Sequence, residues 1–396
     1  MKGHPPFTFS LVEILCFLCY FAIVNPAEPK KAAIINSRQA LRPGGDDLWI
    51  ARSGEAVADA VGHDFDIIAS VGMNAWEIPL YFASRAEARL ILVVPLNQDD
   101  DPEAVQNYYC RQFHIEPGKI RFHFLTLPRG NARKSIFQKE RDLAVIRMAD
   151  ILYPVSIRPD GNLESLIEEQ ENTGVTIARE FQTNYDSRSS ECKVTIDRER
   201  LNPHVDRLLD NYLIHWTRGR STPWPDETSY QFYEDIIHAR DDYPRSAPDT
   251  LMRILRGRKI IASPRHLRKG LRAVSFTGTA PLRAVGLMRW RARYQEMSFE
   301  PYGVAVEKQA ALDIGIRKVI YGEAAMYQNL DNVDSDYFQN AGKEGYWLPE
   351  EEYRFIGDFD LTLLPQEKVT AVVWKKTDIA RIAEIFKGRI VALEKD

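Results

Sequence analysis

The sequence predicts a two-domain protein in which an α/β domain with a mainly parallel sheet precedes an α+β domain. Three observations support this fold class. The chain has 396 residues, too many for one ordinary hydrophobic core. Short apolar runs alternate with helical stretches from residue 31 onward, as in βαβ units. A polar stretch between Asn184 and Arg200 then separates this half from the rest of the chain and indicates a linker.

These observations set the expected boundaries. We expect an apolar extension at 1–30, a first domain at 31–183, a linker at 184–205 and a second domain at 206–396. The linker contains a candidate strand at Lys193–Ile196. With 44% apolar and 27% charged residues and a net charge of −4, the composition is that of a globular protein rather than a disordered one.

The apolar run at residues 7–24 resembles a signal peptide or a membrane anchor at first sight. Glu13 interrupts the run, the basic charge before it is slight, and no Ala-x-Ala cleavage site follows. An acidic residue at the centre of a bilayer helix costs a few kcal/mol, about 2.5–3.5 on insertion scales. We therefore expect a dispensable extension on a cytoplasmic protein, with a single-pass anchor as the alternative.

The four cysteines do not predict a metal site or a disulfide framework. Cys16 and Cys19 form a close pair in the apolar segment, and Cys110 and Cys192 are isolated. No second pair or histidine cluster stands at zinc spacing.

Five buried strands are expected in the first domain, each followed by a turn or a helix. They are Ala32–Asn36, Asp66–Ser70, Leu90–Pro95, Ile120–Leu125 and Ile151–Ser156. In a parallel sheet of this kind, ligands sit at the carboxyl ends of the strands, near the point where the strand order reverses.

Polar and glycine residues follow several of these strands, where backbone N–H groups and helix amino ends can face an anion. Arg141-Asp142 is expected to open the helix before the fifth strand, and Arg158 is suited to pair with a phosphate. The candidate ligand-binding residues are Ser37, Arg38, Ser70, Gly72, Asn74, Glu77, Arg141, Ser156, Arg158, Gly161 and Asn162.

Residues 32–181 resemble the SLOG superfamily. The resemblance rests on Ser70-x-Gly72, on the helix that begins with Arg141 and ends in Ala149-Asp150, and on the turn at Gly161. This Rossmann-like group includes DNA-processing protein A and the Lonely-Guy phosphoribohydrolases. The resemblance implies a nucleotide ligand. Glu77 is suited to orient a ribose hydroxyl, with a favourable partner for the helix dipole as the alternative interpretation. The Pro-Gly-Gly-x-Gly-Thr run of the hydrolases is absent, so nucleotide binding is a better interpretation than hydrolysis.

In the second domain, an ordered set of short motifs resembles the ADP-ribosyltransferase fold, most closely its DarT-type and abortive-infection branches. The resemblance spans residues 212–379. Tyr353 stands where those proteins carry Trp, and the insertion Trp224–Glu227 has no counterpart. The motifs are Tyr212–Thr217, Leu251–Leu255 with Ile260, Ser275–Thr277, Tyr302–Lys308, Val319–Tyr321 and Glu350-x-Glu352-Tyr353-Arg354.

The resemblance implies a cleft between two small sheets that binds NAD as a substrate. In that case His215 contacts the adenosine ribose and Ser275 supports the bound NAD. Glu352 stabilises the positive charge that grows at C1′ as nicotinamide leaves. Thr217 and Thr277 complete the expected catalytic set.

Each of these residues also has a plainer interpretation. His215 next to Trp216 is compatible with a satisfied core histidine, and Ser275 and Thr277 with strand-edge hydroxyls. The acidic run Glu350–Glu352 is compatible with a solvated turn or helix cap.

Residues 251–294 contain twelve Lys and Arg and no Asp or Glu. This basic segment indicates a local anion-binding face, for example for nucleic acid, with a solvated surface as the alternative. The side chains expected to form it are Arg265, Arg268, Lys269, Arg272, Arg289, Arg291 and Arg293.

Together these features predict a nucleotide-sensing domain joined to an ADP-ribosyltransferase-like effector, in prokaryotic defence or conflict. A non-enzymatic nucleotide or nucleic-acid binding protein is one alternative, and a nucleotide hydrolase acting through the first domain is another. The acceptor, the sensed nucleotide, the oligomeric state (a homo-oligomer included) and the activity of the second domain stay open at this point.

Overall fold

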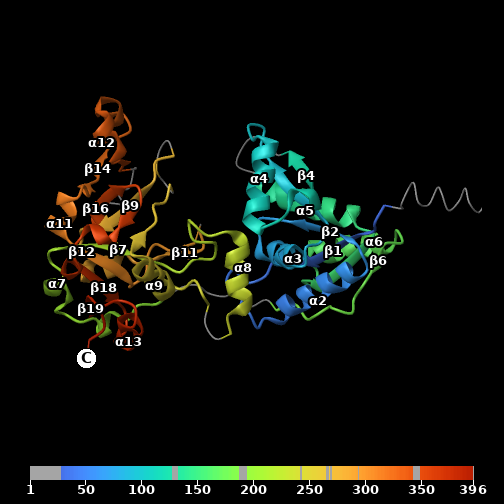
Figure 1. Ribbon diagram of the computed structural model, residues 1–396, viewed down its shortest axis with the longest axis horizontal. Helices are drawn as coiled ribbons and strands as arrows, with labels where there is room; N and C mark the ends of the chain where they lie inside the picture. Colours follow the sequence, from blue (N-terminus) through green and yellow to red (C-terminus); the bar gives the residue numbers. More distant parts are fainter. Residues whose placement is uncertain are drawn as a thin grey trace, which may run out of the picture. The chain divides into compact units, whose positions relative to one another are not determined.

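The computed structural model describes residues 28–126, 133–186, 194–240, 243–264, 267, 270–292, 294–341 and 348–395. These residues form two compact units (Figure 1). Unit 1 contains residues 28–39 and 47–186, and unit 2 contains residues 40–46 and 194–395. Most of the predicted apolar extension lies outside the described residues, and no helix among those described is long and apolar enough to cross a membrane.

Unit 1 is a Rossmann-like domain with a six-stranded parallel sheet in the order β4-β3-β2-β1-β5-β6. All five strands expected from the apolar runs are present, and the short β6 was not expected. The strands are β1 (Lys31–Asn36), β2 (Asp66–Ser70), β3 (Leu90–Leu96), β4 (Ile120–Thr126), β5 (Ile151–Ser156) and β6 (Thr176–Ile177).

Five helices connect these strands and cover the sheet: α2 (Leu48–Gly62), α3 (Asn74–Arg85), α4 (Pro102–Phe113), α5 (Arg133–Met148) and α6 (Asn162–Glu171). Helices α2 and α3 pack on each other, and α5 packs on α6. Because β1 pairs with β2 on one side and β5 on the other, the strand order reverses at β1. The carboxyl ends of β1 and β5 therefore flank the crevice where such sheets bind ligands.

Unit 2 is built on a seven-stranded mixed sheet in the order β13-β16-β9-β7-β12-β18-β19. Among the described residues of this sheet, β18 and β19 pair in parallel and the other neighbouring strands pair antiparallel. Its strands are β7 (Tyr212–Trp216), β9 (Ala273–Thr277), β12 (Gly303–Glu307), β13 (Arg317–Lys318), β16 (Glu352–Ile356), β18 (Val369–Val373) and β19 (Arg389–Ala392).

Shorter strand pairs and helices surround this sheet. The paired strands are β8 (Lys259–Ile260) with β17 (Phe359–Asp360), β10 (Trp290–Arg291) with β11 (Glu296–Met297), and β14 (Ile320–Gly322) with β15 (Phe338–Asn340). The helices are α7 (Val205–Leu208), α8 (Ser229–His238), α9 (Ala247–Gly257), α10 (Pro281–Leu287), α11 (Lys308–Asp313), α12 (Asn332–Asp336) and α13 (Thr377–Ala383).

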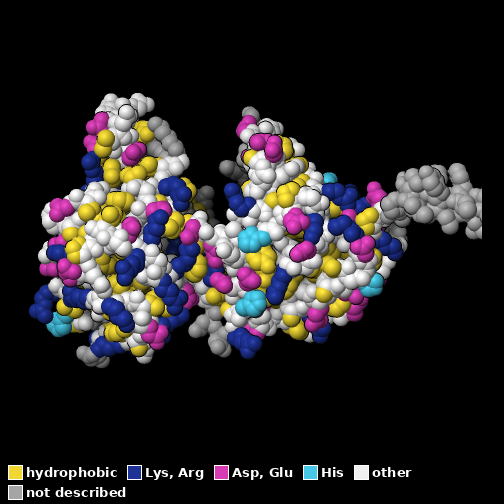
Figure 2. All heavy atoms as spheres, viewed as in Figure 1, with side chains coloured by type: hydrophobic (Ala, Val, Ile, Leu, Met, Phe, Trp, Pro, Cys, Tyr) yellow, Lys and Arg dark blue, Asp and Glu magenta, His cyan; other side chains and the backbone are white. Residues whose placement is uncertain are grey.

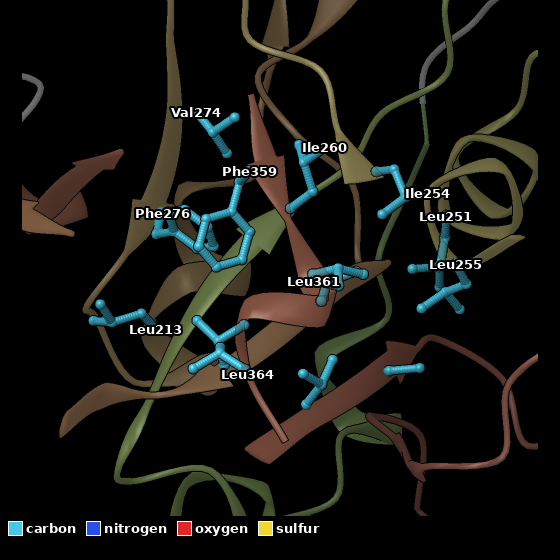
Figure 3. Close-up of a cluster of buried hydrophobic side chains, with 14 of the residues drawn as sticks. Leu213, Leu251, Ile254, Leu255, Ile260, Val274, Phe276, Phe359, Leu361 and Leu364 are labelled. Carbon is cyan, nitrogen blue, oxygen red and sulfur yellow. The ribbon is translucent and has the colours of Figure 1, made fainter. Parts of the chain in front are cut away.

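The two faces of this sheet carry separate cores, as the alternation of side chains along a strand requires. On β12, Val304 and Val306 belong to one core and Ala305 to the other. The first core includes Phe276 and Phe359, whose rings meet edge to face with centroids 5.2 Å apart (Figure 3). Helix α9 closes this core with Leu251 and Leu255.

Local sequence explains where α8 and α9 begin. Both helices start with a reciprocal capping box, Thr228 with Gln231 and Ser246 with Asp249. Each box satisfies backbone N–H groups that the first turn leaves without a helical partner. Helix α9 is therefore held at a defined start, which matters because Thr250, Arg253 and Ile254 of this helix line the main pocket of unit 2.

Several local expectations need correction. Arg141 lies in the middle of α5 rather than at its start, because the helix begins eight residues earlier, at Arg133. No strand forms over the described residues 194–196 of the candidate strand Lys193–Ile196. The later part of the predicted linker belongs to unit 2, where the N–H of Asn202 donates to the carbonyl of Leu393 at 2.7 Å.

Candidate functional site

The main pocket of unit 2 lies where β7 and β9 part. These two strands share a single paired position, Ile214 opposite Thr277. Beyond it, Nδ1 of His215 lies 2.9 Å from the carbonyl oxygen of Ser275. The pocket has a volume of about 350 Å³, within the range of small-molecule sites. The five side chains expected to be catalytic all line it: His215, Thr217, Ser275, Thr277 and Glu352.

Glu352 is the most firmly held of these side chains. Its Oε1 accepts hydrogen bonds from the Ser275 hydroxyl at 2.7 Å and from Nε of Arg354 at 2.8 Å. Nη2 of Arg354 donates to Oε2 of Glu352 at 3.0 Å and to Oε1 of Gln339 at 2.8 Å. Because Arg354 is 4% exposed, the carboxylate is bound by a buried bidentate guanidinium and cannot turn freely.

The tautomer of His215 follows from its contact with Ser275. A carbonyl oxygen can only accept, so Nδ1 carries the proton in this contact. Burial lowers the pKa of His215 below its ordinary value, and the nearby Arg218 lowers it further. The ring is therefore neutral at pH 7, and Nε2 is an acceptor suited to a hydroxyl donor.

The two threonines differ in their surroundings. The Thr217 hydroxyl lies 3.1 Å from the carbonyl of Ala247 and 3.0 Å from that of Tyr302, so its proton is committed to the backbone. This contact ties the end of β7 to the start of α9. Thr277 is buried opposite Glu352 in the β9–β16 register.

A second carboxylate, Glu350, ends a 3-10 turn (Leu348–Glu350) and also lines the pocket. Burial and the neighbouring charge of Glu352 raise the pKa of Glu350 to about 7, against the opposing effect of Arg291 and Arg289. A carboxyl group with this pKa can exchange protons at neutral pH.

The sequence did not single out several side chains that shape this pocket. Arg354 was visible in the Glu-x-Glu-Tyr-Arg motif, and a strand there would have predicted that Glu352 and Arg354, two apart, share a face. Gln339, Arg218 and Arg220 gave no recognisable signal. Arg253, Lys259 and Arg291 lie in the basic segment 251–294, which the sequence marks as a candidate anion-binding face. Among the described residues lining the pocket, six are basic and two acidic: Arg218, Arg220, Arg253, Lys259, Arg291 and Arg354 against Glu350 and Glu352.

Unit 1 brings the residues after β1 and β5 together. The N–H of Ser37 donates to the carbonyl of Ser156 at 2.8 Å, and the Ser37 hydroxyl accepts from the N–H of Arg158 at 2.8 Å. The side chains of Arg38 and Arg158 are exposed at this edge of the sheet. Two guanidinium groups therefore follow adjacent strands at the point where the strand order reverses.

The residues after β2 form a second group at the same edge. Gly72 has a φ of +94°, and its N–H donates to the carboxylate of Glu77 at 2.7 Å. The buried guanidinium of Arg141 lies 5.0 Å from the ring centroid of Trp76. Burial lowers the pKa of Arg141, while the charges of Asp142 and Glu77 raise it.

The remaining predicted residues of unit 1 have simple positions. The Ser70 hydroxyl donates to the carbonyl of Val93 at 2.7 Å and so holds β2 to β3. Asn74 and Asn162 are the first residues of α3 and α6, and Gly161 precedes α6. A Cβ on Gly161 would lie 2.9 Å from the carbonyl oxygen of Arg158, which explains a glycine there.

The structure describes the predicted basic segment only in part. Arg265, Arg268, Lys269 and Arg293 lie outside the described residues. Arg291 lines the pocket, and Arg272 donates to the carbonyl of Ala262 at 2.9 Å. On the visible face of unit 2, basic and acidic side chains are both spread over the surface (Figure 2).

Comparison with known proteins finds similarity only to solved structures of low sequence identity. No family model matches the chain, and no curated protein matches it. Among solved structures, the chain is similar to DNA processing protein A from Helicobacter pylori, described for its single-stranded DNA binding mode, at 13% identity over 39% of this chain and 69% of that one, with a TM-score of 0.28. It is similar to DprA from Streptococcus pneumoniae at 12% identity, with a TM-score of 0.28, over 38% of this chain and half of that one.

Proposed function

We propose that unit 2 binds NAD in the pocket between β7 and β9 and breaks the bond between C1′ of its ribose and the nicotinamide nitrogen. One observation carries this proposal: His215 and Glu352, far apart in sequence, both contact Ser275 at the wall of one pocket. The order of the motifs in unit 2, which resembles that of ADP-ribosyltransferases, also supports the binding and cleavage of NAD.

Cleavage of this bond requires above all that the positive charge developing at C1′ is stabilised. When nicotinamide leaves with the bonding electron pair, C1′ becomes positive, and a fixed carboxylate beside it lowers the barrier. Ser275 and Arg354 fix Glu352 in this way. The Nε2 acceptor of His215 suits a ribose hydroxyl, and Glu350 is suited to take the proton that an attacking acceptor releases.

The test is release of nicotinamide from NAD labelled in that ring by the purified full chain, with and without DNA, RNA or protein as acceptor. Glu352→Gln keeps the size of the side chain and removes its charge. Losing one such contact costs about 3 kcal/mol, or roughly a hundredfold in rate. Glu351→Gln is the matched control. It removes the same charge from the adjacent residue, whose side chain does not line the pocket.

A second candidate function is nucleotide binding without chemistry. The bidentate bonds from Arg354 to Glu352 favour it, because a paired carboxylate is also a common structural element. In that case NAD or ADP-ribose binds, no nicotinamide is released with any acceptor, and Glu352→Gln lowers stability rather than turnover.

For unit 1 we propose nucleotide binding at the carboxyl ends of β1 and β5. The exposed Arg38 and Arg158 and the backbone turn at Ser37 support this. Arg158→Gln is expected to weaken nucleotide binding, measured by calorimetry with a panel of mono- and dinucleotides. Arg147→Gln, at the exposed last turn of α5, is the control. Hydrolysis of a nucleotide that survives removal of Glu352 would instead favour a hydrolase in unit 1.

A further inference from the structure

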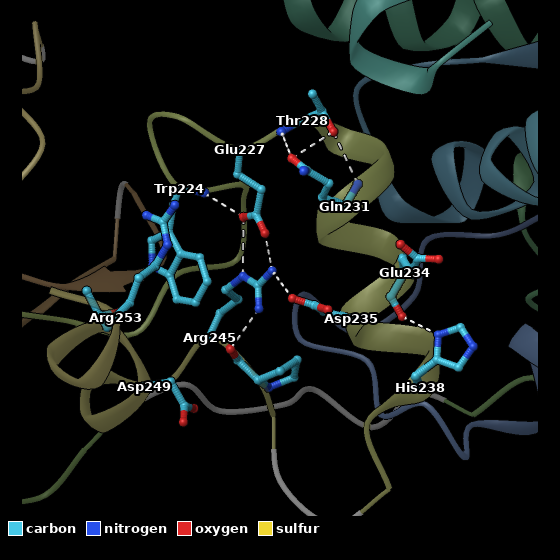
Figure 4. A network of polar contacts seen from close by, with 12 residues as sticks. Trp224, Glu227, Thr228, Gln231, Glu234, Asp235, His238, Arg245, Asp249 and Arg253 are labelled. Carbon is cyan, nitrogen blue, oxygen red and sulfur yellow. Dashed lines mark hydrogen bonds and ion pairs between the residues drawn. The ribbon is translucent and has the colours of Figure 1, made fainter. Parts of the chain in front are cut away.

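Trp224, in the insertion without a family counterpart, is held between two arginines. Its ring centroid lies 3.8 Å from Cζ of Arg245 and 4.5 Å from Cζ of Arg253, and the ring lies between the two side chains in Figure 4. Its indole N–H donates to the Thr250 hydroxyl at 3.3 Å. Cation–π contacts of this kind act within about 6 Å. The two guanidinium groups therefore hold the plane of the indole ring, and the hydrogen bond to Thr250 holds its position.

The inner arginine, Arg245, is an anchor that does not reach the pocket. It is 1% exposed and forms ion pairs with Glu227 and, at 2.7 Å, with Asp235. Its carbonyl accepts the N–H of Arg220 at 2.7 Å, so Arg245 also fixes the chain that follows β7. The insertion is thus folded around a buried charge.

The outer arginine, Arg253, faces the pocket. Thr250, Arg253 and Ile254 lie three and four positions apart on α9, share one face of the helix, and all line the pocket. The side chain of Arg253 is 34% exposed, and its Nη2 donates to Asp226 at 2.6 Å. A guanidinium has five N–H donors, and this bond engages one of its nitrogens.

We infer that Arg253 is the phosphate-binding residue of this pocket and that Trp224 is its positioning residue, so that the ligand is a nucleotide carrying a diphosphate. The planar guanidinium matches phosphate oxygens in pairs, and a side chain already stacked loses less entropy on binding. Arg218, Arg220 and Lys259 also line the pocket, which favours more than one anionic group. The inference rests on the proposed use of this pocket for a nucleotide.

The test is calorimetric binding of ADP, AMP and adenosine to the full chain. Arg253→Gln is expected to weaken ADP at least tenfold, about 1.4 kcal/mol, and adenosine less than twofold. Arg256→Gln removes the same charge from an exposed position on the same helix and is expected to leave all three affinities unchanged. Trp224→Leu is expected to weaken ADP but not adenosine, with little further loss when combined with Arg253→Gln.

Three results would overturn the inference. They are an unchanged ADP affinity in Arg253→Gln, an equal loss for ADP and adenosine, and no binding of ADP by the unaltered chain. A loss of adenosine binding in Trp224→Leu would make Trp224 a base-stacking surface instead. The proposed reaction is judged separately: if ADP binding follows Arg253 while no nicotinamide is released from NAD, the reaction fails and the phosphate site stands.

Discussion

The Ser275 hydroxyl donates a 2.7 Å hydrogen bond to Oε1 of Glu352, across 77 positions of sequence. In the antiparallel register Ser275 lies opposite Arg354. The hydrogen bond therefore runs diagonally to Glu352, which lies two residues from Arg354 on the same face of β16. With the two bonds from Arg354, three donated hydrogen bonds orient one carboxylate at the wall of the pocket. Each of these partners can be removed separately, and the effects should differ.

Removing the Ser275 hydroxyl should affect turnover more than stability. Ser275 is exposed in the middle of β9, and a hydrogen bond to a charged group contributes about 1.5–3 kcal/mol. Ser275→Ala is therefore expected to slow nicotinamide release by roughly tenfold to a hundredfold. Ser298→Ala removes a hydroxyl of the same pocket that donates to the Leu287 carbonyl, and its rate should stay within about twofold. Equal rates in both variants would remove Ser275 from the mechanism.

Removing the Arg354 guanidinium should affect stability strongly. Arg354 is buried, and its loss leaves Glu352 without its charged partner. Breaking such a pair costs about 3–5 kcal/mol. Arg354→Met is expected to lower the free energy of unfolding, measured in urea, by this amount, and the double variant Glu352→Gln/Arg354→Met should recover part of the loss. A double variant no more stable than Arg354→Met alone would show that the pairing is not the cause.

Strands β1, β2, β3 and β5 of unit 1 were predictable because each is a short apolar run that is largely buried on both faces, for example Leu90–Leu96. Strand β16 was harder, because it starts at Glu352 directly after acidic residues that equally suit a turn. The parting of β7 and β9 depends on long-range pairing that leaves no local pattern. The position of Arg253 depends on the fold of the insertion around Arg245. The motif residues were therefore identifiable, and the wall that surrounds them was not.

The raised pKa of Glu350 predicts a pH-dependent loss of stability. The folded state holds this proton up to a pKa of about 7, whereas the unfolded chain releases it near the ordinary 4.5. Between these values the folded state binds more protons, so the chain loses stability as pH rises through this window. Glu350→Gln should remove that loss, so its thermal midpoint relative to the unaltered chain should increase from pH 4.5 to pH 8. A constant difference across this pH range would contradict the assignment.

In unit 1, two glycines should respond in opposite directions to alanine. Gly72 has a φ of +94°, where a Cβ is strained by about 1–2 kcal/mol. Gly62 ends α2, and a Cβ there meets no atom within 4 Å. Gly72→Ala should therefore lower the unfolding midpoint. Gly62→Ala should leave the midpoint unchanged or raise it, because alanine stabilises a helix by up to about 1 kcal/mol relative to glycine. A similar response of both variants in urea would argue against the backbone geometry at Gly72.

Loss of the buried charge of Arg245 should affect both the stability of unit 2 and the binding of ADP. Its guanidinium pairs with Glu227, whose side chain is 7% exposed, so Arg245→Met leaves a buried carboxylate without its cation. The expected loss is about 3–5 kcal/mol of unfolding free energy, and Glu227→Gln in the same chain should restore part of it. Because Arg245 also stacks on Trp224, the single variant should free Arg253 and weaken ADP binding. Stability restored by Glu227→Gln without restored ADP binding would show that stacking, rather than the ion pair, positions Arg253. If Arg245→Met keeps full ADP affinity while losing stability, the insertion serves the fold alone and Trp224 has no positioning role.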